Sequence, residues 1–404
     1  MKSFLKSGGL NSEGTKWYLG RVPPEFVLSD ADVIIANTDV TPGSDIIGSA
    51  ACVPSEYVGN SSFSHHVTRL RVKSHAVSPR FLARALLLER VRRAMRAESR
   101  GTTVKMLDMA GALAIKVGVL PHEEQSVVVD ILDTLDTAIH QTQAIIAKLK
   151  AVKQGLLHDL LTRGIDANGE LRPPQAEAPH LYKPSPQGWI PMEWSVQPLA
   201  AYTASEITYG IVQAGPHVSG GVPYIRTGDM SGDALVRESM LCTSRRIANS
   251  YARSEVRAGE IVMSIRATVG KVLPVPDDLD GANLTQGTAR ISPNSKTDGT
   301  FLLWAIRHTR AQQAIQLEIK GTTFAEITLG ALRQVPIAAP MDINEQHEIA
   351  KRLTAIDEWL WVEQEGLAKR LSEKSGLMDD LLTGRVRVTP LLDSVQQPAA
   401  HSGS

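Results

Sequence analysis

The sequence predicts an α/β protein in which one unit, an α/β module followed by a long helix, occurs twice. Three observations predict this fold class. Short motifs recur at an offset of about 220 residues along the 404-residue chain, two helical segments carry matching apolar patterns, and strand-like and helix-like runs occur together inside each module. We therefore expect an internal repeat in which two long helices separate two α/β domains.

The repeat is visible as four pairs of matching motifs. Each copy holds a Gly-Thr-Thr triplet, a Pro–Glu-Gln segment, an aliphatic-Asp pair and a Leu-rich segment that ends in Leu-Leu-Thr. They lie at residues 101–103, 121–125, 135–136 and 155–162 of the first copy. In the second copy they lie at residues 321–323, 340–346, 356–357 and 376–383. Because the offset is nearly constant, the two copies are expected to share one architecture.

The long helices are predicted from apolar residues that alternate at four- and three-residue spacings, the pattern of a coiled-coil seam. The first seam is Val128, Leu132, Leu135, Ile139, Thr142, Ile146, Leu149, Lys153, Leu156 and Leu160. The second is Ile349, Leu353, Ile356, Leu360, Glu363, Leu367, Arg370, Lys374, Leu377 and Leu381. One such segment fits a helix packed on a core equally well, but two matching segments favour mutual pairing. A helix of about 38 residues spans about 57 Å and would hold two modules at a fixed distance.

Glycines and prolines mark the ends of these helices. Gly164 and Gly384 stand where a left-handed C-terminal cap is expected. The predicted organisation is a first domain over 1–120, a central helix over 121–165, a proline-rich linker over 166–187, a second domain over 188–340, a C-terminal helix over 341–388 and a loose tail over 389–404. Inside the modules we expect strands over 259–265 and 288–292 and single helices over 80–97 and 301–317.

Composition excludes several classes of protein. Lys+Arg and Asp+Glu balance at 43 each, which excludes a uniformly basic protein, and Cys52 and Cys242 lack the spacing of a zinc or disulfide framework. No apolar run has the length of a signal peptide or a membrane span, so a soluble protein of a reducing compartment, the cytoplasm, is expected. The charge is nevertheless segregated, since residues 60–105 hold eleven Lys and Arg against two Glu. Basic modules on acidic helices favour a polyanion ligand, although a solvated helix face fits as well.

A convincing catalytic constellation is missing. Residues 215–222 lack the Lys-Ser/Thr of a phosphate loop, and no methyltransferase motif of the Asn/Asp-Pro-Pro-Tyr/Phe type occurs. The histidines His65, His66 and His122 lack companions at ligand spacing, and we expect them to be surface residues without a metal. A nuclease carboxylate pattern would need Asp277 with residues 318–320, and its first copy lacks the lysine.

Residues 28–388 contain two modules with repeated Gly-Thr-Thr, Pro–Glu-Gln and Leu-Leu-Thr motifs. In these features the chain resembles the specificity subunit of type I restriction–modification enzymes. Residues 153–165 are especially similar to the central conserved region of that family. The resemblance implies two target recognition domains that each read one half of a split DNA sequence, with the two helices forming an antiparallel coiled coil and a pseudo-twofold internal repeat.

The same resemblance implies partners and cofactors. Two modification (methyltransferase) subunits would dock on the helices and supply S-adenosylmethionine, and restriction subunits would supply ATP- and Mg-dependent translocation and cleavage. This chain would carry no active site. In the first copy only 27 residues precede Leu28, whereas about 68 lie between Gly188 and Val256 of the second, so the first module is expected to lack about 40 residues at its front. Either its recognition surface is reduced or the start of the chain is displaced.

Polar loop residues in basic surroundings are the predicted DNA contacts, because arginine and amide side chains read base edges and basic groups hold phosphates. They are Tyr224, Arg226, Ser244, Arg245, Arg246, Arg266, Thr268 and Lys320 in the second module and Asn37, Arg69, Arg100 and Lys105 in the first. The repeated Gly-Thr-Thr triplets are expected to be buried structural turns. Two alternatives remain open: a scaffold that recruits proteins, and a self-contained nuclease or methyltransferase.

Overall fold

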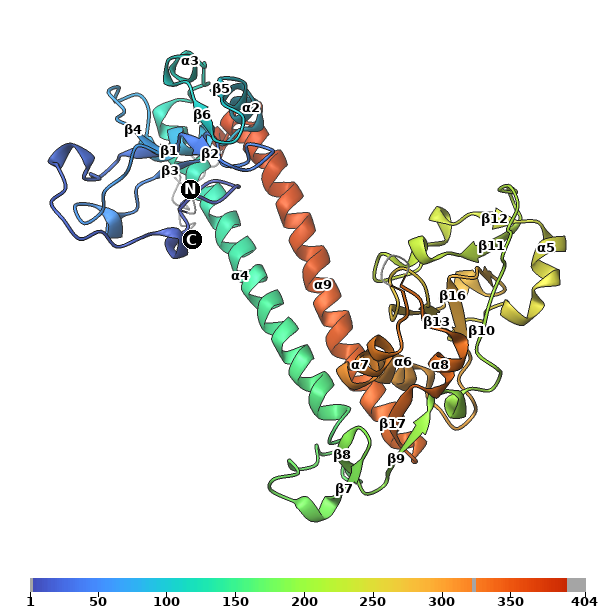
Figure 1. Cartoon of the computed structure of the whole chain (residues 1–404). Helices are drawn as coiled ribbons and strands as arrows, with labels where there is room; N and C mark the ends of the chain where they lie inside the picture. The colour runs from blue at the N-terminus through green and yellow to red at the C-terminus, as the bar shows by residue number, and fades with distance from the viewer. Residues whose placement is uncertain (1–2, 322–324, 391–404) are drawn as a thin grey trace, which may run out of the picture. The chain divides into compact units, whose positions relative to one another are not determined.

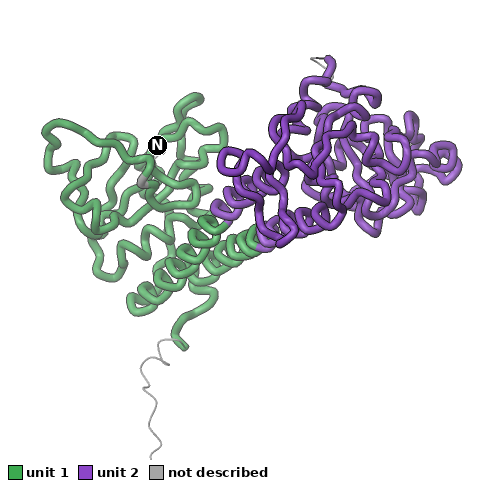
Figure 2. Tube along the Cα trace, turned by 90° about the horizontal axis from the view of Figure 1, so that it is seen from below, with its two compact units in different colours: residues 1–145, 363–404 green, residues 146–362 purple. Residues whose placement is uncertain are grey.

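The computed structural model describes residues 3–321 and 325–390, which form two compact units (Figures 1 and 2). Unit 1 comprises residues 1–145 and 363–404, and unit 2 comprises residues 146–362. Each unit contains one α/β module and a part of each of two long helices. The predicted fold class is thus confirmed.

The module of unit 1 is built on two three-stranded antiparallel sheets with strand orders β3-β1-β4 and β2-β6-β5. The strands are β1 (Val33–Ala36), β2 (Thr38–Asp39), β3 (Ala50–Cys52), β4 (Val67–Leu70), β5 (Ser99–Arg100) and β6 (Lys105–Leu107). The helices are α1 (Pro79–Ala85), α2 (Glu89–Ala97) and α3 (Met109–Leu113). Phe81 of α1 packs with Val33 and Ile35 of β1 in the unit's main hydrophobic core.

The module of unit 2 has a larger antiparallel sheet of order β10-β16-β13-β14 and a further sheet of order β12-β11-β15. The strands of these sheets are β10 (Thr208–Tyr209), β11 (Val222–Ile225), β12 (Cys242–Thr243), β13 (Ile261–Ser264), β14 (Val272–Pro274), β15 (Asn283–Leu284) and β16 (Thr288–Ile291). Two-stranded sheets pair β7 (Tyr182–Ser185) with β8 (Gly188–Pro191) and β9 (Trp194–Pro198) with β17 (Pro336–Pro340). The helices are α5 (Arg245–Ser250), α6 (Gly299–Arg307), α7 (Thr309–Leu317) and α8 (Leu329–Gln334).

The two modules repeat one strand arrangement. The three strands β3-β1-β4 of unit 1 correspond to β14-β13-β16 of unit 2, and the pairing of Ala36 with Val67 matches the pairing of Ser264 with Thr288. The described residues of unit 1 form no counterpart of β10 or of the β12-β11-β15 sheet. The shortened front predicted for the first module therefore corresponds to a missing sheet.

The long helices are α4 (His122–Leu160) and α9 (Ile343–Leu382), and their parts pack together in each unit. In unit 1 the start of α4 and the end of α9 share a buried cluster that includes Val128, Leu132, Leu381 and Leu382. In unit 2 the end of α4 and the start of α9 share another, which includes Leu160, Ile349 and Leu353. The helices are thus antiparallel, and every predicted seam position except Leu377 is buried or half-buried.

In each unit, an equivalent ion pair joins the start of one long helix to the segment that follows the end of the other. In unit 1, Glu124 at the start of α4 accepts from Arg387 beyond the end of α9 (Oε2–Nε 2.9 Å). In unit 2, Glu345 at the start of α9 accepts from Arg172 beyond the end of α4 (Oε1–Nη1 2.6 Å). Gly164, at φ +64°, makes room for the second pair, since a Cβ there would lie 2.3 Å from the Glu345 carboxylate. Hydrogen bonds from Arg387 lower the pKa of Glu124, which keeps this buried carboxylate charged.

The glutamine of each Pro–Glu-Gln motif anchors a module to its long helix. The Gln125 Oε1 accepts from the backbone N–H of Ser78, directly before α1 (2.7 Å), and the Gln346 Oε1 accepts from that of Asp298, directly before α6 (2.9 Å). Both glutamine side chains are buried, and their Nε2 atoms donate to backbone carbonyls, among them those of Leu120 and Pro340. The repeated motif is thus a joint between module and helix.

Three expectations on local structure need correction. The single helices expected over 80–97 and 301–317 are each two helices, because residues 86–88 leave the helix in one copy and His308 is extended (ψ 147°) in the other. The segment 166–187, expected to be a linker, carries Arg172 and strand β7, which pairs with β8, and it is packed into unit 2. Its prolines fit the edge of a two-stranded hairpin, where a missing N–H is tolerated.

Candidate nucleic-acid interface

An open groove of about 390 Å³ lies on the module of unit 2. Four segments supply its walls: a strip from Ile211 to Ala214, the turn after β11, the segment after β13 and the turn before β16. Its polar lining consists of Arg226, Thr227, Arg266, Thr285 and Gln286. The groove brings together the predicted contacts Arg226 and Arg266, which are 40 residues apart in sequence.

Arg226 is fixed at the groove by a two-point contact with Asp229. Its Nε and Nη2 donate to the two carboxylate oxygens at 3.0 and 2.6 Å, and its backbone N–H donates to the same side chain at 2.8 Å. These hydrogen bonds from Arg226 to Asp229 raise the pKa of the guanidinium. Since 40% of the Arg226 side chain remains exposed, the cation is held in place while part of it faces the groove.

Arg266 is fixed on another wall of the groove. Its Nη2 contacts Glu326 at 2.9 Å, and its Nε is buried without a hydrogen-bond partner within residues 3–321 and 325–390. The next residue, Ala267, has a left-handed backbone (φ 61°), which is uncommon for a residue other than glycine. Strand β13 ends at Ser264, and Arg266 lies between this strand end and the left-handed residue Ala267.

Sequence reasoning missed Gln286 and Thr227. Gln286 lies in the turn between β15 and β16, and its backbone N–H donates to Ile211 (3.0 Å). A Cβ at the following residue, Gly287, would lie 2.5 Å from the Thr227 hydroxyl, so the two walls approach closely there. The only signal in the sequence was a polar residue just before the predicted strand over 288–292, which does not distinguish a groove from an ordinary turn.

Helix α5 carries two cations beside the groove. The Ser244 hydroxyl accepts from the backbone N–H of Ile247 (3.3 Å) and caps the helix, so this predicted contact is a structural residue. Arg245 and Arg246 in the first turn are exposed and have no ion-pair partner in the described part of the chain. The preceding strand is tied to the groove wall, because the Thr243 hydroxyl donates to the Ala214 carbonyl (2.6 Å).

Three further predicted contacts of the second module lie elsewhere. Tyr224 is only 5% exposed within β11, so its ring cannot serve as the surface contact that was expected. Thr268 is exposed, and its hydroxyl contacts that of Ser264 (3.3 Å). Lys320 is exposed and forms a backbone bridge with Glu326, the partner of Arg266.

The predicted contacts of the first module are mostly held by the protein itself. Arg69 donates to the Val27 carbonyl (3.0 Å) and leaves only 14% of its side chain exposed, so it is a structural residue. Lys105 donates to the Ser44 hydroxyl (2.8 Å). Asn37 donates to the His65 carbonyl (3.2 Å), and Arg100 is exposed and ion-paired with Asp108 (3.0 Å).

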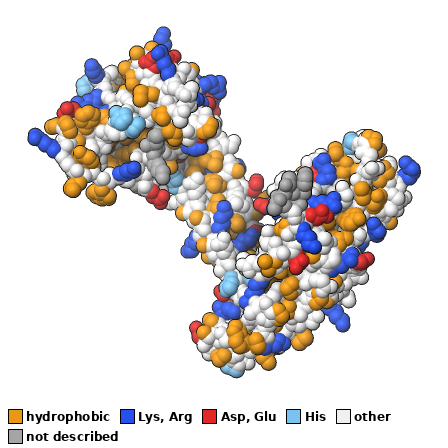
Figure 3. Space-filling view, viewed as in Figure 1, with side chains coloured by type: hydrophobic (Ala, Val, Ile, Leu, Met, Phe, Trp, Pro, Cys, Tyr) orange, Lys and Arg blue, Asp and Glu red, His pale blue; other side chains and the backbone are white. Residues whose placement is uncertain are grey.

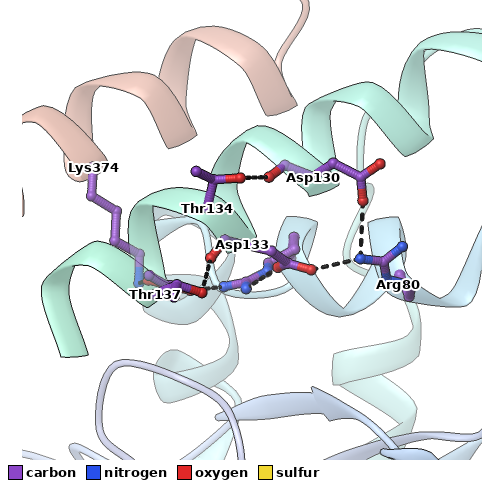
Figure 4. Close-up of polar contacts among 8 residues, drawn as sticks. Arg80, Asp130, Asp133, Thr134, Thr137 and Lys374 are labelled. Carbon is purple, nitrogen blue, oxygen red and sulfur yellow. Dashed lines mark hydrogen bonds and ion pairs between the residues drawn. The ribbon is translucent and has the colours of Figure 1, made fainter. Parts of the chain in front are cut away.

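The basic residues of helix α1 are ion-paired with the long helix α4. Arg80 contacts Asp133 (2.6 Å) and Asp130 (3.1 Å) on α4, as Figure 4 shows, and Arg84 contacts Asp133 and Asp136. The polyanion interpretation therefore needs correction for Arg80 and Arg84, because these two arginines join the module to the long helix. On the face shown in Figure 3, Lys and Arg side chains are dispersed among acidic and apolar ones.

The carboxylate of Asp136 on α4 links α4 to α9. Asp136 accepts from Lys374 (2.5 Å) and from Arg84 (2.5 Å). Burial raises the pKa of Asp136, but the hydrogen bond from Lys374 and the charge of Arg84 outweigh burial and the pKa is lowered. In unit 2 the equivalent pair joins Lys153 to Asp357.

The Gly-Thr-Thr triplet of the first module was expected to be a buried turn, and this is wrong. Residues 101–104 are all exposed at the tip between β5 and β6. The hairpin is held by its strands, with Arg100 paired to Met106, and the tip is left in solvent. In the second copy Thr322 and Thr323 lie outside the described residues.

Within the described residues, no group of three or more His, Cys, Asp or Glu is placed to hold a metal ion. Among the helices of that same part of the chain, none combines the length and apolarity that crossing a membrane requires. The groove itself is lined by arginines, hydroxyls and an amide, which are groups that bind phosphates and base edges.

Several relatives of known description resemble the chain. It is 28% identical over 280 residues to a protein of Methanocaldococcus jannaschii described as the type I restriction enzyme MjaX specificity subunit, which covers 68% of the chain and 60% of that protein. It is 23% identical to the EcoBI specificity subunit of Escherichia coli (85% and 70% covered) and 22% identical to the MjaVIII specificity subunit of M. jannaschii (91% and 82% covered). The chain thus spans less than two thirds of the MjaX protein.

The fold resembles that of the crystal structure of the type I restriction–modification system S subunit from M. genitalium. The TM-score is 0.58 at 12% identity, with 94% of this chain and 88% of that one covered. The model of the type I restriction modification DNA specificity domain matches residues 2–151 and 214–370, which is most of the chain. One matched segment includes strands β1 to β6 and the other includes β11 to β17, in agreement with the duplicated modules, and the chain belongs to the type I restriction modification DNA specificity domain family.

Proposed function

We propose that this chain is the DNA-binding specificity subunit of a type I restriction–modification complex and that each module reads one half of a bipartite target. The observation that supports this most directly is the groove of unit 2. It combines two arginines held by acids, Arg226 and Arg266, with the amide of Gln286, and the exposed Arg245 and Arg246 lie beside it; among the described residues the last three side chains have no acid or hydrogen-bond partner. Such a set provides both the phosphate-binding and the base-reading groups that duplex recognition requires.

The two parts of this surface have different roles. Arg245 and Arg246 are exposed and have no acidic partner within residues 3–321 and 325–390, and they bind phosphates. Arg226 and Arg266 are oriented by carboxylates, which suits contact with a defined atom at a base edge or a phosphate. The described residues of the first module form no corresponding sheet, and from them we expect fewer contacts to its half-site.

The long helices dock the partner subunits. Trp359, Trp361 and Val362 on one stretch of α9 are all more than half exposed, and such aromatic side chains are enriched at protein interfaces. We propose that two modification subunits bind α4 and α9, with restriction subunits joining the complex. The chain itself is non-catalytic, so S-adenosylmethionine, ATP and Mg are bound by these partners.

The test is the salt dependence of DNA binding by the full chain after Arg245→Ala and Arg246→Ala are combined. Each lost phosphate contact lowers the slope of log K against log salt by about 0.9, so the double variant is expected to lower it by about 1.8. Lys148→Ala with Lys150→Ala removes two exposed charges from α4 and serves as the matched control. An unchanged slope in the Arg245/Arg246 variant would remove both from the interface, and a wild-type chain that does not bind duplex DNA would favour the protein scaffold instead.

A further inference from the structure

The strand register of the two modules identifies one equivalent position at the edge of each. In unit 2, Ser264 of β13 pairs with Thr288 at the start of β16, and Gln286 lies two residues before Thr288. In unit 1, Ala36 of β1 pairs with Val67 at the start of β4, and two residues before Val67 lies His65. The turns at Gln286 and His65 therefore occupy the same place in the repeated sheet.

Gln286 is available to a ligand. Its side chain is half-buried in the groove, and among the described residues no group forms a hydrogen bond with its amide. Its backbone is held by the hydrogen bond to Ile211, and Arg226 and Arg266 line the same groove. A primary amide that presents a donor and an acceptor from a fixed backbone matches the paired acceptor and donor of adenine in the major groove.

His65 is presented in a similar way by different chemistry. Its ring is exposed and lies next to the ring of His66, with 3.8 Å between centroids and a tilt of 43° between the ring planes. The His66 Nδ1 contacts the Thr38 hydroxyl (3.0 Å), and the His65 carbonyl accepts from Asn37 (3.2 Å), so the neighbouring ring and the backbone of His65 are held in place. The edge of the His65 ring is left to contact a ligand. Thr38 also stands at the register position that Arg266 occupies in unit 2.

From this equivalence we infer that Gln286 and His65 are the residues at which the two modules discriminate between bases, one in each half of the DNA target. The sheets that carry them repeat the same pairing, while the exposed group differs between a primary amide and an imidazole. A duplicated protein that reads two different half-sites needs such a position, where the backbone is conserved by the fold and the side chain is free to differ. The inference rests on the proposed function, because it assigns residues to a DNA surface.

The experiment is selection of bound duplexes by the full chain from a library with randomised positions. Gln286→Ala is expected to reduce discrimination at one base pair of one half-site about tenfold and to leave the other half-site unchanged. His65→Ala is expected to do the converse. Gln286→Glu replaces the amide by an acceptor, and the enriched base at the same position is expected to change toward cytosine.

Two exposed side chains serve as matched controls, Gln313→Ala on α7 in unit 2 and His75→Ala in unit 1, and neither is expected to alter the selected sequence. If wild-type chain selects no sequence, the proposed function fails. If wild-type chain selects a bipartite sequence but the Gln286 and His65 variants select the same one with equal discrimination, the proposed function stands and this inference is overturned. Loss of all selection by a variant that still unfolds like wild type also overturns it, since the residue would then support binding in general.

Discussion

The joint formed by Gln125 and Gln346 makes a quantitative prediction about stability. Each side chain is buried at the start of a long helix and joins that helix to the loop before the first helix of a module. Replacing either by alanine removes all of its side-chain hydrogen bonds and leaves their backbone partners without them. The change does not touch the groove, so its effect should be on folding.

The geometry sets the expected size of the effect. Gln125 makes three hydrogen bonds, at 2.7, 2.8 and 2.8 Å. Gln346 makes two at 2.9 Å and one at 3.4 Å, which is close to the limit of a hydrogen bond. At about 1 kcal/mol net for each good bond, Gln125→Ala should lower the free energy of unfolding by about 3 kcal/mol and Gln346→Ala by about 2 kcal/mol.

Urea unfolding followed by far-ultraviolet circular dichroism measures this loss. Hydrogen exchange then localises it, because the Ser78 amide should lose protection in the Gln125 variant and the Asp298 amide in the Gln346 variant. Gln143→Ala and Gln364→Ala, at exposed positions of the same two helices, are the controls. Losses no larger than those of the controls would refute the assignment of these glutamines as the joints between module and helix.

Two more predictions concern ionisable groups. Burial, with smaller effects of Arg310 and His158, lowers the pKa of His308 to about 4 from its ordinary 6.5, so folded protein keeps the ring neutral and unfolded protein binds the proton first. The contribution of neutral His308 to the free energy of unfolding is therefore complete above about pH 6.5 and is lost as the pH falls toward 4, by about 2 kcal/mol at pH 5. The variant His308→Phe should flatten this part of a plot of unfolding free energy against pH. An equally steep plot for the variant would contradict the prediction. A double-mutant cycle on Lys374 and Asp136, measured by urea unfolding, should give a coupling energy of about 1 kcal/mol. The coupling energy of Lys153 and Asp357 should be smaller, because the side chains of that pair are more exposed. Equal coupling energies would show that burial does not determine the strength of these ion pairs.

The periodic features of the fold were predictable from the sequence. The two helix seams, the glycine at position 164 and the strands β13 and β16 follow from spacing and turn residues, which act over a few positions. The break at His308 was not predictable, because neither glycine nor proline marks it and the extended backbone is stabilised by the fold around it. The hairpin of β7 and β8 was hidden for the opposite reason, since its prolines are typical of a linker.

The site was predictable in part. Composition identified Arg226, Arg266, Arg245 and Arg246, but it could not show which arginines are neutralised, because the acidic partners of Arg80 lie about 50 residues away in sequence. Burial of Tyr224 likewise depends on the sheet that forms around it. Gln286 and His65 could have been found only by aligning the two copies through their strands, since nothing about either residue alone is unusual.

Ala267 has a consequence for how tightly the groove can bind. A left-handed backbone costs alanine about 1 kcal/mol, and glycine would adopt it freely. The methyl group of Ala267, however, restricts the backbone conformations that the loop can adopt, and the Ala267 backbone N–H donates to the Ala325 carbonyl (3.0 Å). The loop that carries Arg266 is thus preorganised, and an incoming ligand loses little affinity to the entropy of ordering it.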